Sequence, residues 1–121
     1  MKFIEVPLVF TNTSMTGTTT ISSSAMFVGD TSLYSIQAVW TGTPAGTMKL
    51  QASNDPTPAI GTIPYTVSNW SDITYSFLTL TGSAGNYLWS VDNCAYKFVR
   101  ITYTNTSGSG SLAAIMVRKG S

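Results

Sequence analysis

Two-residue periodicity is the feature of this chain that most restricts its fold, and it is clearest in residues 96–118. Apolar side chains recur at Val99, Ile101 and Tyr103, and most of the intervening positions are polar. A Ser/Gly turn follows, and then an apolar run continues to Val117, just before Arg118. Such alternation is typical of a strand with one buried face, and a Gly-containing interruption between two runs favours a hairpin. The sequence therefore predicts an antiparallel β-hairpin here, with Val99, Ile101 and Tyr103 facing the core.

The same pattern recurs along the rest of the chain. Residues 32–40 alternate, with one face formed by Tyr34, Ile36, Ala38 and Trp40, and a return strand at 48–53 follows the Gly/Pro turn at 42–46. Shorter β-prone segments lie at 2–10, 18–22, 25–28, 70–73, 77–80 and 87–91. No stretch has a helical period. About seven to nine short antiparallel strands, with turn signals between them, predict one all-β domain over residues 1–121, a jelly-roll-like β-sandwich.

Two segments are expected to make contacts with other chains. Pro7 places strand 2–10 at a sheet edge or a bulge, so we expect this strand to pair in a sheet or to lie at an oligomer contact. Residues 11–17 are predicted to be a polar connection.

Residues 56–68 form a long inserted loop whose three prolines exclude it from a central strand. Its apolar side chains indicate a contact surface, with a lid over the chain's own core as the alternative. The partner-contact residues expected on these grounds are Phe3, Val6, Ile60, Ile63, Tyr65 and Trp70.

Composition argues against nucleic acid and membranes as partners and favours association with further copies of the chain. Charged residues make up 9% of the chain, and its six basic residues are scattered, which argues against nucleic acid or an anionic membrane as a ligand. Polarity comes instead from 19 Thr and 16 Ser. No apolar run is long enough to span a membrane, no signal-peptide pattern is present, and Cys94 has no second cysteine to pair with. We therefore expect synthesis in a cytoplasm. A weakly charged surface is poorly protected against association, so a homo-oligomer is expected.

The chain has few side chains that could act in catalysis. The chain has no histidine, so the commonest general base and metal ligand is missing and Cys94 cannot form a Cys–His pair. Asp30, Asp55 and Asp92 could contribute to a calcium site, but each stands beside Gly, Asn or another turn residue, which favours a turn or cap role. We expect no enzyme activity, no catalytic residue, no cofactor and no metal.

Aromatic side chains are the remaining candidates for ligand contact, because they can stack on sugar rings. The candidates are Trp40, Tyr65, Trp70, Tyr87 and Trp89. Trp40 shares a face with Ile36 and Ala38, so it is expected in the core. Trp70 follows the inserted loop, and surface exposure or an interface is expected there.

Three segments together resemble the small β-sandwich modules of tailed-phage virion proteins. They are WTGTPAG at 40–46 with SND at 53–55, WSDI at 70–73, and YKFVRITYT at 96–104 followed by SGSG at 107–110. The resemblance covers residues 32–118, and the insertion at 56–68 departs from it.

The resemblance implies a structural protein of the virion, made in the host cytoplasm. The leading hypothesis is a capsid decoration or cement protein that binds and stabilises the head shell, with the major capsid protein or another virion protein as its partner. The alternative is a carbohydrate-binding or host-recognition module on a tail or head fibre, with a glycan as its ligand. Trp70, Tyr65 or Tyr87 would then be the stacking platform.

Overall fold

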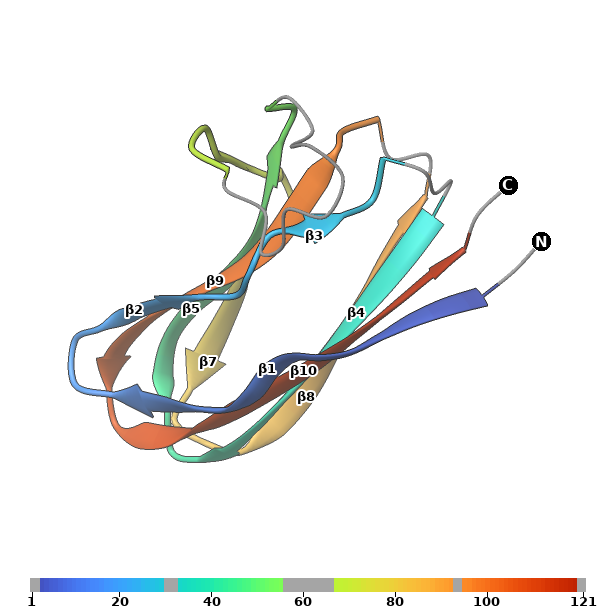
Figure 1. The fold of residues 1–121 in the computed structure, drawn as a ribbon. Coiled ribbons are helices and arrows are strands. Elements are labelled where there is room, and N and C mark those ends of the chain that lie inside the picture. The colour runs from blue at the N-terminus through green and yellow to red at the C-terminus, as the bar shows by residue number, and fades with distance from the viewer. Residues whose placement is uncertain (1–2, 30–32, 56–66, 93–94, 120–121) are drawn as a thin grey trace.

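The structure, a computed structural model, describes residues 3–29, 33–55, 67–92 and 95–119 and shows the side chains of strand β1 only from residue 13 onward. The described residues form strands, turns and loops, and no helix (Figure 1). The strands are β1 (Phe3–Thr16), β2 (Thr20–Ser22), β3 (Met26–Phe27), β4 (Leu33–Gly42), β5 (Ala45–Ser53), β6 (Ser71–Asp72), β7 (Leu78–Thr81), β8 (Gly85–Asp92), β9 (Phe98–Ser107) and β10 (Ser109–Lys119).

These strands form two antiparallel sheets packed face to face (Figure 1). Sheet A has the order β1-β10-β4-β8. In sheet B, β9 and β5 are central, with β2 and β3 along one side and β6 and β7 along the other. If β2/β3 and β6/β7 are each counted as one interrupted strand, the sandwich has eight strands. The first strand lies beside the last, and the chain winds between the sheets as in a jelly roll. The predicted jelly-roll-like sandwich is confirmed, and the two interruptions explain why ten strands appear rather than about seven to nine.

The core lies between the sheets and is built from the inward positions of the strands. On β4 the predicted inward residues Tyr34, Ile36, Ala38 and Trp40 are all buried, and their neighbours in sequence are exposed or half-buried. On β9, Val99, Ile101 and Tyr103 are fully buried, and they belong to the same cluster as the β4 residues. The period-2 pattern therefore identified the inward faces of both strands correctly.

The predicted hairpin at 96–118 is wrong. β9 pairs with β2, β3 and β5 in sheet B, whereas β10 pairs with β1 and β4 in sheet A. Gly108 alone separates the two strands, and it has a φ of 74°. A single residue is shorter than the usual two-residue hairpin loop, and here it turns the chain across the core to the opposite sheet. The turn between β4 and β5 is also a crossing between sheets, since these strands do not pair either.

β1 forms one edge of sheet A, where it pairs with β10. The pairing shifts register between Val6 and Phe10 and again between Phe10 and Thr13, close to Pro7. The strand continues to Thr16, so the polar connection predicted at 11–17 is wrong up to that residue. Threonine suits a pleated sheet, and Thr13 and Thr16 pair with Leu112 and Ser109.

Candidate functional site

The structure describes only part of the predicted contact set. Ile60, Ile63 and Tyr65 lie outside the described residues, as do Cys94 and Asp30. Phe3 and Val6 occupy register positions opposite Lys119 and Met116 on β10, and their side chains are not described. Trp70 is half-buried, next to β6.

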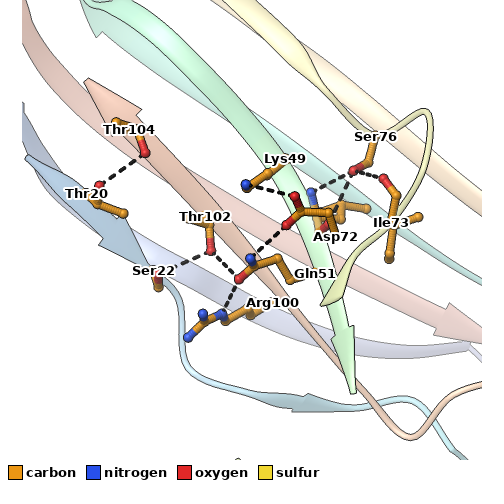
Figure 2. A network of polar contacts seen from close by, with 11 residues as sticks. Thr20, Ser22, Lys49, Gln51, Asp72, Ile73, Ser76, Arg100, Thr102 and Thr104 are labelled. Carbon is orange, nitrogen blue, oxygen red and sulfur yellow. Dashed lines mark hydrogen bonds and ion pairs between the residues drawn. The ribbon is translucent and has the colours of Figure 1, made fainter. Parts of the chain in front are cut away.

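Trp70 lies beside a network of outward side chains on sheet B, here called the polar face. Figure 2 shows most of this network. The polar face consists of Thr20, Ser22, Lys49, Gln51, Trp70, Asp72, Arg100, Thr102 and Thr104. It arises because alternate residues of β9 and β5 point away from the core, and the outward positions from Arg100 to Thr104 and from Thr47 to Gln51 carry hydroxyl, amide or charged groups.

Gln51 is the centre of the polar face (Figure 2). Its Oε1 accepts hydrogen bonds from Arg100 Nε at 2.8 Å and from Thr102 Oγ1 at 3.0 Å. Its Nε2 donates to Asp72 Oδ1 at 2.9 Å. Three strands, β5, β6 and β9, therefore hold this one amide in a fixed orientation.

One of the two cations on the polar face is paired with its one carboxylate. Lys49 Nζ lies 3.1 Å from Asp72 Oδ2. The hydrogen bond from Gln51, followed by the contact with Lys49, lowers the pKa of Asp72 below its usual value, so this carboxylate is ionised at neutral pH. Burial lowers the pKa of Arg100, because desolvation disfavours the cation.

Aromatic rings flank the charged side chains. The guanidinium carbon of Arg100 lies 4.4 Å from the centre of the Trp70 ring, which is a close cation–π geometry. Lys49 Nζ lies 5.4 Å from the centre of the exposed Phe77 ring. Among the described residues, Arg100 donates only its Nε–H, so its two Nη groups are available to a ligand or to water.

A row of threonines crosses the same side of sheet B. Thr20 pairs with Thr104, Thr104 with Thr47, and Thr47 with Thr79, so the row spans β2, β9, β5 and β7. Thr20 and Thr104 also share a hydrogen bond of 3.1 Å between their hydroxyls. The result is an uncharged hydroxyl surface next to the polar face.

The outward side of sheet A, here called the apolar face, mixes exposed apolar side chains with serine, threonine, asparagine and glutamine. Its exposed apolar residues are Val39, Leu88 and Ile115, which are 47%, 55% and 42% accessible. Leu88 and Ile115 flank Gln37 on neighbouring strands, and Val39 pairs with Ala113. The outward positions between Ser35 and Thr41 on β4, and those paired with them on β8 and β10, carry no charged residue.

The other aromatic candidates divide between core and surface. Trp40 and Trp89 are buried, and their indole N–H groups donate to the backbone oxygens of Ser83 and Ser76. Tyr87 is partly exposed on β8. Sequence reasoning missed the roles of Gln51 and Arg100, although the alternation of β5 and β9 placed both on outward positions.

Asp55 has the turn role that its sequence context favoured. Its carboxylate accepts hydrogen bonds from the backbone N–H groups of Ser68 and Asn69, at 2.8 and 3.2 Å, and from Asn69 Nδ2 at 2.9 Å. These bonds, that of the Asn69 side chain first, lower the pKa of Asp55. Within the described part of the chain, no three acidic or cysteine side chains gather into a group that could hold a metal ion.

The sequence matches no protein-family model and no curated protein. Solved structures share its fold at low identity. The PBSX exported protein XepA superposes with a TM-score of 0.66 at 11% identity, over 98% of this chain and 37% of XepA. The chain thus spans little more than a third of XepA. The SPBc2 prophage-derived protein YomS gives 0.54 at 10% identity, over 98% and 95% of the two chains.

A third similar structure is a carbohydrate-binding module, the C-terminal CBM6 of LamC from Zobellia galactanivorans. Its TM-score is 0.53 at 8% identity, over 98% of this chain and all of the module. At these identities the shared property is the antiparallel β-sandwich. None of the described residues belongs to a helix long and apolar enough to cross a lipid bilayer.

Proposed function

We propose that the chain is a structural module of a phage-type virion, and specifically a capsid decoration or cement protein that binds the major capsid protein. The observation that carries this proposal is the apolar face. Exposed apolar side chains on three neighbouring strands, with no charge between them, are typical of a surface covered in an assembly. The fold shared with the PBSX exported protein XepA and with the SPBc2 prophage-derived protein YomS supports the same assignment.

The mechanism of stabilisation would be repeated burial of this face. Each Å² of apolar surface removed from water contributes roughly 25 cal/mol. Copies that bridge neighbouring capsid subunits would combine modest contacts through multivalent attachment. The rigid sandwich behind the face fixes the orientation of the contact residues.

Placing charges in the apolar face tests this proposal. We expect the double variant V39D/I115D to lose at least tenfold in affinity for purified undecorated capsids, because two carboxylates would be desolvated in the contact. Bound protein is measured by co-sedimentation. The matched control is T79D/T104D, which places the same charges on the outward side of sheet B and should bind like wild type. Equal binding by V39D/I115D and wild type would exclude this face as the shell contact, and wild type that does not bind would refute decoration.

The polar face favours a second candidate function, recognition of a host glycan. Fixed amide, guanidinium and hydroxyl groups beside the half-buried indole of Trp70 are the kinds of group that hydrogen-bond and stack on a sugar. The fold shared with a carbohydrate-binding module is compatible with this function.

Tryptophan fluorescence tests this candidate directly. Trp40 and Trp89 are buried, so a host polysaccharide bound at the polar face should change mainly the emission of Trp70. We expect a saturable shift that W70A abolishes and Y87A retains. If no host polysaccharide changes the emission of the wild type, the glycan function is excluded and the structural role alone remains.

A further inference from the structure

The four edges of the two sheets are protected to very different degrees. An unpaired strand edge invites pairing with another chain, and proteins block such edges with proline, bulges, charges or very short strands. β1 carries Pro7 and two register shifts. Both edges of sheet B are broken into short strands of two to four residues.

β8 has none of these protections. It is eight residues long and pairs with β4 in continuous register, from Leu33↔Asp92 to Trp40↔Gly85. Within the described part of the chain, β4 is the one strand with which it pairs. Its sequence contains no proline, lysine or arginine, and its one charged residue, Asp92, is at its end. β8 is therefore the edge of this sandwich most open to another strand.

The loop at 73–76 lies beside β8 but forms no backbone–backbone hydrogen bond with it. A surface pocket of about 360 Å³ runs beside the strand, between residues 87–92 and the loop at 73–76. Tyr75 in this loop is 98% exposed and has a φ of 72°, an uncommon conformation for a residue other than glycine. Tyr87 and Leu88, both partly exposed, line the same pocket.

We propose that β8 pairs antiparallel with β8 of a second copy about a two-fold axis, which joins the two A sheets into one sheet of eight strands. An occupant of this edge must present apolar side chains inward and uncharged ones outward, and β8 itself meets this requirement at every position from 86 to 91, with Asp92 as the one charged outward residue at its end. In an antiparallel pair, opposed residues share a face, so inward positions must oppose inward positions. Centring the pair on Leu88 satisfies this condition, because Leu88 meets Leu88 of the second copy and Tyr87 meets Trp89.

This register also avoids repulsion. The two Asp92 carboxylates lie at opposite ends of the paired strands, about 27 Å apart at the usual rise per residue, which is well beyond the screening length in physiological salt. A sheet of eight strands is within the usual size range. The pairing would place the two apolar faces side by side, with the Leu88 side chains at the junction. The proposal does not depend on the identity of the particle.

Charge substitution at Leu88 tests the proposal on the full chain by sedimentation velocity. Wild type should be a dimer, and L88K and L88E should each raise the dimer dissociation constant at least tenfold, because like charges would face each other. An equimolar mixture of L88K and L88E should recover the dimer, since opposite charges then meet. Circular dichroism confirms that each variant is folded.

The matched control is V39K, which places the same charge on the same face but on the central strand β4. It should remain dimeric. The proposal is overturned if wild type is a monomer at 100 μM. The same result would be found if the β8 edge paired only with a strand of the capsid protein. The proposal is also overturned if L88K stays dimeric, or if mixing L88K with L88E restores nothing.

Discussion

Replacing Ile101 with alanine is expected to lower the free energy of unfolding by about 2–5 kcal/mol, the usual cost of a large-to-small change in a core. Ile101 is fully buried near the middle of β9 and belongs to the cluster that joins both sheets. Its partner on β5, Leu50, is also buried, so the cavity would open at the centre of the sandwich. Urea denaturation followed by fluorescence measures the loss.

The matched control is the same substitution at Ile115, which points outward from β10 and is partly exposed. I115A should cost less than about 1 kcal/mol, because the side chain loses little buried area. Similar losses for I101A and I115A would mean that β9 does not present Ile101 to the core. A one-residue shift of register would have that consequence.

Replacing Gly108 with alanine is expected to destabilise the protein by at least about 2 kcal/mol. Two effects add at this corner between the sheets. The φ of 74° costs a residue with a Cβ roughly 1–2 kcal/mol, and the added Cβ would overlap the backbone carbonyl oxygen of Thr43. Because that obstacle is backbone, the link between β9 and β10 itself would have to move. Thermal unfolding should show a clearly lower midpoint.

Gly17 separates the two effects. Its φ is 61°, but a Cβ added there would meet nothing within 4 Å. G17A should therefore cost only the conformational contribution, roughly 1–2 kcal/mol, and less than G108A. If G17A and G108A lower stability equally, the close approach of Gly108 to Thr43 is not present in solution.

The sequence predicted the strands and their inward faces better than the way the strands pair. Alternation on β4 and β9 reports which side chains are buried, and those assignments are confirmed. Alternation carries no information on whether consecutive strands share a sheet. It therefore predicts a hairpin at Gly108 and a return strand after Gly42 without showing which sheet the next strand joins. In the structure both turns connect one sheet to the other. A jelly roll of this kind depends on pairings between strands far apart in the chain, such as β1 with β10.

For the candidate site, too, the sequence predicts individual residues better than the contacts between them. The sequence singles out Trp70 because it is an aromatic residue after a proline-rich segment. It does not single out the network around Gln51, because Gln51 meets Asp72 and Arg100 across 21 and 49 residues of sequence. These contacts follow from the register of β5 with β6 and β9, which local pattern does not determine. The apolar face follows from the outward positions of β4, β8 and β10, and it became visible only once these strands were placed side by side.

The copy number of this chain in purified particles tests the proposed function most directly. Under the proposed function the encoding genome is that of a phage or prophage, so its particles are purified, and the molar ratio of this chain to the major capsid protein is measured by gel densitometry or quantitative mass spectrometry. A decoration protein should be present in hundreds of copies per particle and should be released when its apolar face carries the V39D/I115D changes. A handful of copies would instead indicate a tail or fibre module, and absence from purified particles would contradict a structural role in the virion.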